Sequence, residues 1–228
     1  MKKREWLRWT TIVILLVVSL VLIFNQQIKY YLVGTYHPQV TKQTVQQNNA
    51  KEAKYDFSNV QDLNLQSVAK ARARKQSINV IGVISVPAIK MSIPIGKGVD
   101  NNTLALAAGT MRADQKMGQG NYALAGHNMA HGSRILFSPL YYDAKVGQKI
   151  YLTDMNRIYE YRINERKFID ASRVDVVENT PQKIVTLITC NATGSRRLMI
   201  RGNYVKSMQF EKAPQSVQKS LSKGYTNR

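Results

Sequence analysis

Cysteine is almost missing from this sequence, with a single residue, Cys190, among 228. A single thiol cannot close an intrachain disulfide, and it cannot supply the thiolate set of a cysteine-rich zinc site. Free cysteine is often a small buried apolar residue, whereas an exported thiol that is kept despite the risk of oxidation favours a working nucleophile. Both interpretations of Cys190 are open at this point.

Several common functional motifs are also missing. The chain has no G-x-x-x-x-G-K-S/T phosphate loop, no H-E-x-x-H zinc motif and no G-x-S-x-G nucleophile elbow. His127 and His131 are four residues apart, but no glutamate lies between them and no third ligand is evident. A length of 228 residues excludes a large multidomain enzyme.

Acidic residues are scarce as well, since 14 Asp and Glu stand against 33 Lys and Arg, for a formal net charge of +19. This charge favours anionic partners such as phosphate polymers or lipid head groups. The carboxylates are scattered along the chain, so their spacing does not indicate a calcium site.

There is only one long hydrophobic run. Residues 10–24 carry no charge, and the run extends through Ile28, which approaches the roughly 20 residues needed to cross a bilayer. Tryptophans at 6 and 9 and tyrosines at 30 and 31 flank it, as aromatic residues do at lipid–water boundaries. No small-x-small cleavage site follows, so we expect an uncleaved anchor and not a signal peptide.

The short N-terminal end is basic, with Lys2, Lys3, Arg4 and Arg8 before the apolar run. The positive-inside rule predicts that this end stays in the cytoplasm. The protein is then a single-pass protein of the cell membrane, with everything after residue 28 outside the cytoplasm.

The remaining sequence changes character at Ile78. Residues 29–76 are polar and are expected to form a stalk or a peripheral helix, with a basic surface helix at 65–75. Short branched and aromatic runs with Gly and Pro turns follow, which indicates an all-β barrel or sandwich. Strands are expected within 78–96 and at 122–125, 149–153, 158–163, 167–169, 184–189 and 198–205, with short helices near 102–108 and 135–140. We therefore divide the chain into a cytoplasmic end (1–8), a transmembrane anchor (9–28), a polar stalk or peripheral helix (29–76), a β domain (77–206) and a basic C-terminal tail (207–228).

Cys190 ends the strand-like run IVTLITC, and turn-forming residues follow it. Strand alternation places Thr186, Ile188 and Cys190 on one face, so periodicity allows either a buried or an exposed thiol. A cysteine nucleophile needs a base or a cationic partner, because a thiol with a pKa near 8.5 is mostly protonated at neutral pH. His127, which follows the small-residue run ALAG, is the better candidate partner, although a purely structural histidine is the alternative.

An acyl-transfer site also needs donors for the oxyanion. Arg196, Arg197 and Arg201 lie on the strand expected after Cys190. Alternation puts Leu198 and Ile200 on one face and leaves Arg197 and Arg201 on the other.

These residues resemble the sortases, the membrane-anchored cysteine transpeptidases of Gram-positive bacteria. The resemblance covers residues 77–206 and is carried by TLITC at 186–190, LAGH at 124–127, AAGTM at 107–111 and the Arg-apolar-apolar-apolar-basic-Gly end at 197–202. The N-terminal anchor and the absence of an Asp-Pro-aromatic lid motif resemble the class A, or housekeeping, branch.

The resemblance implies a closed eight-stranded β-barrel in which Cys190 is the nucleophile, His127 the acid/base and Arg197 the oxyanion and substrate clamp, with Arg196 as the fallback. It implies substrate-pocket roles for Met111, Ala125, Val176, Val177, Ile188 and Thr189. The implied substrates are surface proteins with Leu-Pro-x-Thr-Gly (LPXTG) signals, cut between Thr and Gly and joined to an amine of the peptidoglycan precursor lipid II.

No cofactor, metal or nucleic-acid partner is implied for this chain. Some class A sortases bind calcium, but Asp100 and Glu178 do not form a convincing cluster here, so calcium is not carried over. Two other functions stay open. A secreted cysteine peptidase would resolve its acyl-enzyme with water, and a non-enzymatic anion-binding module would leave the thiol incidental.

Overall fold

The structure is a computed structural model that describes residues 2–57, 60, 63–73, 78–129, 134–191 and 193–222. His131 lies outside the described residues, as do parts of the expected stalk and the last six residues of the expected tail.

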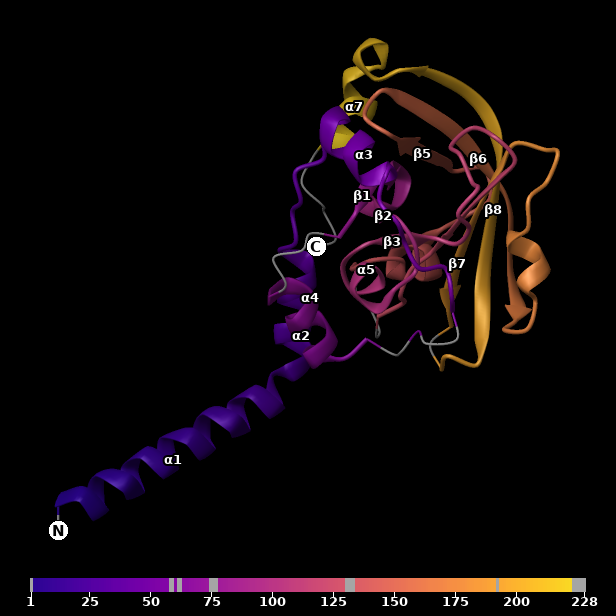
Figure 1. The fold of residues 1–228 in the computed structure, drawn as a ribbon. Helices are drawn as coiled ribbons and strands as arrows, with labels where there is room; N and C mark the ends of the chain where they lie inside the picture. Colours follow the sequence, from indigo (N-terminus) through magenta and orange to yellow (C-terminus); the bar gives the residue numbers. More distant parts are fainter. Residues whose placement is uncertain are drawn as a thin grey trace.

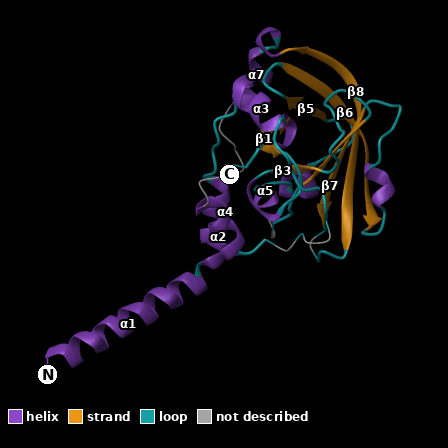
Figure 2. Ribbon diagram, viewed as in Figure 1, coloured by secondary structure: helices purple, strands orange, loops and turns teal. Residues whose placement is uncertain are grey.

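Eight strands form one closed barrel in the order β1-β2-β3-β4-β7-β8-β6-β5 (Figures 1 and 2). The β2–β3 and β4–β7 pairs are parallel and the others are antiparallel. The strands are β1 Val80–Val86, β2 Met91–Gly96, β3 Ala108–Thr110, β4 Asn121–Ala125, β5 Lys149–Thr153, β6 Arg157–Asp170, β7 Ile184–Cys190 and β8 Arg196–Gln209. The expected all-β fold, a closed eight-stranded barrel with short helices and an N-terminal apolar helix, is confirmed.

Some boundaries differ from the expectation. The runs at 158–163 and 167–169 belong to one long strand, β6, because two bulges bend it without ending its pairing with β8. Strand β3 was not expected, since it has only three small residues and its first, Ala108, lies at the end of the run expected as a helix.

The barrel interior is filled by alternate residues of each strand. Val185 and Leu187 of β7 and Leu198 and Ile200 of β8 are buried in this core. Their neighbours on the opposite face include Ile188 and Met199, which pack in a separate apolar cluster outside the barrel. The alternation read from the sequence is therefore the alternation between barrel interior and exterior.

Seven α-helices and three short 3-10 helices are described around the barrel. They are α1 Lys2–Ile23, α2 Asn25–Gly34, α3 Lys42–Asn49, α4 Leu65–Ala73, α5 Asn101–Leu106, α6 Ser138–Asp143, α7 Gln215–Ser222, η1 Pro87–Ile89, η2 Val174–Val177 and η3 Phe210–Lys212. The short helices expected near 102–108 and 135–140 correspond to α5 and α6.

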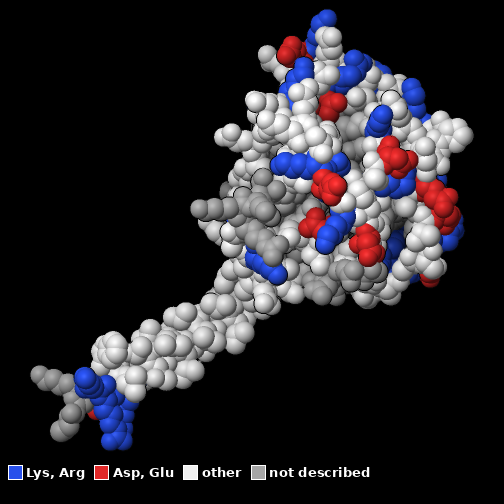
Figure 3. Space-filling model, viewed as in Figure 1, with Lys and Arg blue, Asp and Glu red and all other residues white. Residues whose placement is uncertain are grey.

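Helix α1 projects away from the barrel (Figure 1). Its window from Lys3 to Ile23 is long and apolar enough to cross a membrane, and none of it is buried. Figure 3 shows basic side chains at its free end and an uncharged surface along its length. This arrangement suits a membrane anchor.

The described residues of 29–73, expected as a stalk or a peripheral helix, include helices that pack on the barrel. Val33 of α2, Val45 of α3 and Val68 of α4 are buried, and α4 packs against both α2 and α5. The helix expected at 65–75 keeps Lys70 exposed, but Val68 and Ala71 face inward. A few apolar residues at helical spacing are enough to dock this otherwise polar segment.

The expected C-terminal tail also has structure. Strand β8 continues to Gln209, and helix α7 docks through Leu221, which is buried, and Val217, one turn before it. The described part of 207–228 is therefore packed on the barrel.

Candidate active site

The parallel pairing of β4 with β7 brings the candidate base to the candidate nucleophile. Ala125 at the end of β4 is paired with Ile188 of β7. His127 lies two residues after Ala125, and Cys190 lies two residues after Ile188. Because parallel strands emerge at the same edge of a sheet, the imidazole and the thiol meet at one edge of the barrel.

Three hydrogen bonds join the two chain segments at this edge. The Gly126 N–H donates to the Ile188 carbonyl (3.1 Å), and the Thr189 hydroxyl donates to the Gly126 carbonyl (2.7 Å). The Asn128 side-chain Nδ2 donates to the Cys190 carbonyl (3.0 Å). The residues that flank His127 are thus fixed to the end of β7, and the part played by Asn128 was not expected from the sequence.

Strand register decides between the two candidate arginines. Arg197 of β8 is paired directly with Cys190 of β7. Arg196 turns toward β6, where its guanidinium donates to the Phe168 carbonyl (3.0 Å) and lies 5.8 Å from the centroid of the Phe168 ring. Arg197 donates to the Gly194 carbonyl (2.8 Å), in the loop that follows Cys190.

A cavity of about 330 Å³ lies at this edge of the barrel. All nine site residues predicted from the sequence line it: Met111, Ala125, His127, Val176, Val177, Ile188, Thr189, Cys190 and Arg197. We call this cavity the catalytic groove. The structure therefore brings together every residue of the predicted set, while Arg196, the fallback, does not line the groove.

The groove also has residues that sequence reasoning missed: Phe57, Val60, Leu104, Gly126, Ile169, Asp170, Ala171, Arg173 and Val174. Ile169 lies in the strand run expected at 167–169, but its pairing with Arg197, which puts it at the groove, is seen only in the structure. Phe57 and Val60 come from the segment expected as a stalk or a peripheral helix, and no local pattern marks them.

The floor of the groove is apolar. Ile169, Val176, Ile188 and Met199 are buried together, with Met111 and Val177 packed against them. The η2 segment forms one wall, and the fully buried Asn121 holds it by donating from Nδ2 to the carbonyls of Val176 (3.0 Å) and Glu178 (2.9 Å). The floor can take apolar side chains, and its wall is fixed from inside the barrel.

Two carboxylates near the groove, Asp170 and Asp175, already have hydrogen-bond donors. The backbone N–H and the hydroxyl of Ser172 hold the pKa of Asp170 below its ordinary value. A hydrogen bond from Arg173, with two contacts of 2.7 Å, lowers the pKa of Asp175 in the same way. Arg197 is the arginine of the groove that faces Cys190.

Within the described parts of the chain, no three His, Cys, Asp or Glu side chains gather as a metal site would require. Asp100 caps the N-terminus of α5 with both carboxylate oxygens, which accept from the N–H groups of Asn102 and Thr103 and from the Thr103 hydroxyl. Glu178 follows η2 as its C-cap.

A closed barrel whose groove holds a thiol, an imidazole and a guanidinium has the parts of a cysteine acyl-transfer enzyme. Comparison with known proteins agrees with this class. The Sortase domain family model matches residues 84–205.

The relatives found by sequence cover most of the chain. Sortase A of Streptococcus agalactiae is 36% identical over 97% of this chain and 94% of its own length. Sortase A of Listeria monocytogenes is 38% identical over 90% of this chain and 95% of its own length. The chain therefore belongs to the sortase family. It is a class A sortase, a cysteine transpeptidase of cell-wall sorting.

Solved structures agree with the fold. The crystal structure of the Listeria monocytogenes sortase A has a TM-score of 0.57 at 38% identity, covering 62% of this chain and 96% of that one. Sortase C-3 of Streptococcus pneumoniae, at 23% identity, has a TM-score of 0.58 over 86% of this chain and 99% of that one, which supports the fold alone.

Proposed function

We propose that this sortase cuts Leu-Pro-x-Thr-Gly signals of surface proteins between Thr and Gly and joins the new Thr carboxyl to an amine of lipid II. Cys190 is the nucleophile, His127 the acid/base and Arg197 the oxyanion clamp. The observation that carries this proposal is that all three line one groove with an apolar floor.

In the first half-reaction the Cys190 thiolate attacks the Thr carbonyl carbon, and the carbonyl oxygen becomes an oxyanion. The Arg197 guanidinium, held opposite Cys190 by strand pairing, stabilises that charge. Protonated His127 gives its proton to the Gly nitrogen as the peptide bond breaks. The products are a thioester on Cys190 and a free Gly amine.

In the second half-reaction neutral His127 takes a proton from the incoming amine as that amine attacks the thioester carbonyl. The carbon–sulfur bond then breaks and the Cys190 thiolate returns. As written, these steps balance without a metal or other cofactor.

The remaining groove residues would position the signal. The apolar floor formed by Ile169, Val176 and Ile188, with Met111 and Val177 beside it and the buried Met199 behind it, suits the Leu and Pro side chains. Ala125 and Thr189 lie next to His127 and Cys190 and would border the Thr-Gly bond.

An apolar N-terminal helix suggests membrane anchoring. We further propose that residues 1–8 are cytoplasmic, that 9–28 cross the membrane and that the barrel of 77–206 works outside the cytoplasm. The basic N-terminal end supports this orientation.

A product analysis tests the function. The purified protein is mixed with a Leu-Pro-x-Thr-Gly peptide and short glycine or alanine peptides, and the products are identified by mass spectrometry. We expect peptides joined through Thr to the added amine. Release of the free Thr carboxylate alone would show a hydrolytic peptidase and contradict the proposal.

A further inference from the structure

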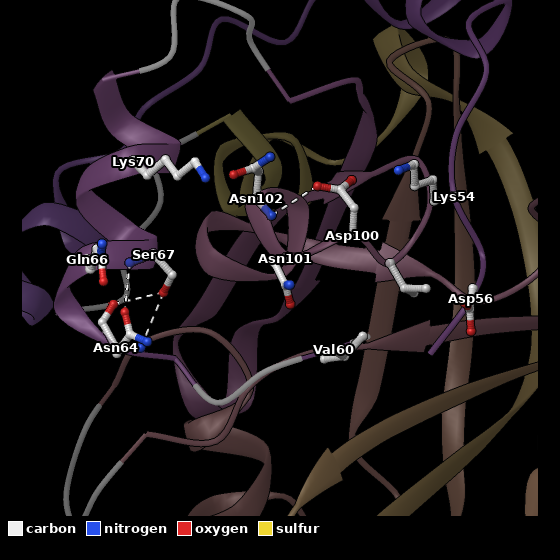
Figure 4. A pocket seen from close by; sticks show the side chains of 11 residues that line it. Lys54, Asp56, Val60, Asn64, Gln66, Ser67, Lys70, Asp100, Asn101 and Asn102 are labelled. Atoms are coloured by element: carbon white, nitrogen blue, oxygen red, sulfur yellow. Dashed lines mark hydrogen bonds between the residues drawn. The ribbon is translucent and has the colours of Figure 1, made fainter. Parts of the chain in front are cut away.

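A second cavity, larger than the catalytic groove, lies beside it. It has a volume of about 660 Å³, and its lining residues are mostly polar: Lys54, Asp56, Val60, Asn64, Gln66, Ser67, Lys70, Val99, Asp100, Asn101 and Asn102. We call it the polar cavity. Figure 4 shows Lys70 of α4 and Asn102 of α5 pointing toward one another across it.

The polar cavity adjoins the catalytic groove. Val60 lines both, and α5 lies between them, with Leu104 in the groove and Asn101 and Asn102 in the polar cavity. A ligand bound in the polar cavity could therefore extend into the groove.

Its walls are held by hydrogen bonds and by apolar packing. The Val99 N–H donates to the Lys54 carbonyl (2.8 Å). This hydrogen bond fixes the loop around Lys54 to the segment that leads into α5. On the opposite side, the Asn64 side chain accepts from the Ser67 N–H (2.8 Å) and so caps the N-terminus of α4. Helices α4 and α5 then pack through Val68, Ala105 and Leu106.

The polar cavity is lined by two lysines and two aspartates, and its lysines are the groups that can bind an anion. Asp100 is occupied in capping α5, and Asp56 already has a partner. Across the described residues, no ion pair or side-chain hydrogen bond engages the ammonium group of Lys54 or Lys70. Two uncommitted ammonium groups suit phosphate oxygens, and the surrounding amides suit the hydroxyl and acetamido groups of a sugar.

The polar cavity also lies on the side of the barrel that carries the anchor. Helix α2 follows α1 directly and packs against α4, which lines the cavity (Figure 1). A ligand embedded in the membrane by a lipid chain would meet this side first.

We infer that the polar cavity binds the diphosphate-linked saccharide of the lipid-borne amine substrate, with Lys54 and Lys70 on the phosphates, and so directs its amine to the thioester on Cys190. This inference rests on the proposed function, because it assigns a binding site to the second substrate of that reaction.

The test uses the full chain in phosphatidylcholine vesicles with and without lipid II. The variant Lys54→Gln/Lys70→Gln removes both charges and keeps the side-chain polarity. Lys145→Gln/Lys206→Gln removes two exposed lysines that line neither cavity, and it controls for general charge attraction. Transfer of the peptide to lipid II is compared with transfer to hydroxylamine, a small amine that needs no head-group site.

We expect the Lys54→Gln/Lys70→Gln variant to lose about tenfold in transfer to lipid II for each lysine removed, with hydroxylamine transfer unchanged. The control pair should keep both activities. The inference would be overturned if the two double variants transferred the peptide to lipid II equally well. It would also be overturned if Lys54→Gln/Lys70→Gln lost as much transfer to hydroxylamine as to lipid II.

A binding measurement separates this inference from the proposed function. In the Cys190→Ala background, which cannot turn over, lipid II in vesicles should protect Lys54 and Lys70 from amine acylation. Unprotected lysines would overturn the inference even if transfer occurs, and protected lysines would support it even if no transfer is found. Equal protection by soluble UDP-N-acetylglucosamine would assign the polar cavity to a free diphosphate sugar and overturn the lipid-borne source.

Discussion

Cys190 and Arg197 are direct partners in the antiparallel pairing of β7 with β8. Residues opposed in this way have Cβ atoms about 4.5–5.5 Å apart. Their separation is therefore set by the barrel hydrogen bonds and not by a loop. Arg196, one residue earlier, turns to Phe168 on the neighbouring strand.

This register predicts unequal effects of two conservative substitutions. Arg197→Lys should lower the rate of acylation by about 10²–10³, because an ammonium cannot reproduce the planar guanidinium donor at the oxyanion. Arg196→Lys should be nearly silent. The measurement is the pH–rate profile of both variants beside the parent.

The shape of that profile separates the roles of Arg197 and His127. A thiolate nucleophile and a protonated imidazole give a bell-shaped dependence on pH, and the guanidinium stays charged throughout. Arg197→Lys should therefore be slow with its bell unchanged. A large loss at Arg196 with none at Arg197 would refute the assignment by register.

The second prediction concerns the bonds that join the Cys190 and His127 segments. Thr189→Val keeps the side-chain shape but removes the hydroxyl that donates to the Gly126 carbonyl. We expect a loss of about 1–3 kcal/mol in the free energy of unfolding and a fall in kcat, because the loop that carries His127 is released. Thermal unfolding and steady-state kinetics measure the two effects.

Thr153→Val is the control, since the buried Thr153 hydroxyl also donates to a backbone carbonyl, that of Arg157 (2.7 Å), and Thr153 does not line the groove. This hydroxyl accepts from the Met155 N–H as well (2.9 Å), so the loss of stability should be at least as large as at Thr189. Thr153→Val should lose stability while kcat stays at the parent value. If both variants lost kcat equally, the Thr189 bond would have only a structural role.

A third prediction follows from the space beside His127. A Cβ on Gly126 would lie 2.7 Å from the ring of Phe137, which is fully buried and whose N–H donates to the His127 carbonyl. Gly126→Ala should therefore cost about 1–3 kcal/mol in stability and displace the His127 loop. The double variant with Phe137→Leu should recover part of both losses, and no recovery would argue against this contact.

Much of the architecture could be predicted from local patterns. Alternation along 184–190 and 198–205 separates the barrel interior from the groove face, and it already placed Cys190 with Ile188 and Arg197 with Arg201. The pairing of β4 with β7 could not be predicted in this way, because a parallel pair joins segments far apart in the sequence. That pairing is what brings His127 to Cys190.

The N-terminal segment shows the other limit of local patterns. Residues 29–73 are mostly polar, so composition favours a stalk or a peripheral helix. Only the folded structure shows that Val33 and Val68 pack with Met129 and Leu136, in the loop that follows His127. Phe57 reaches the groove for the same reason, since the path of the chain and not its periodicity brings it there.

The fourth prediction uses this packing. A chain that begins at Asn25 should keep the stability and peptide activity of the parent, because α1 is not packed on the barrel. A chain that begins at Ala50 loses Val33 and Val45, each worth about 1.5–3 kcal/mol of burial. We expect a lower Tm and weaker activity at 37 °C. Equal Tm values would show that α2 and α3 do not support the barrel.

The most direct test of the central claim is an intact-mass measurement of the acyl-enzyme. The protein is mixed with a Leu-Pro-x-Thr-Gly peptide in the absence of an added amine, and the parent is compared with Cys190→Ala. We predict that the parent gains the mass of the peptide up to Thr, that hydroxylamine removes this adduct, and that Cys190→Ala folds like the parent without forming it. An adduct on the folded Cys190→Ala variant, or peptide joining by that variant, would contradict the account.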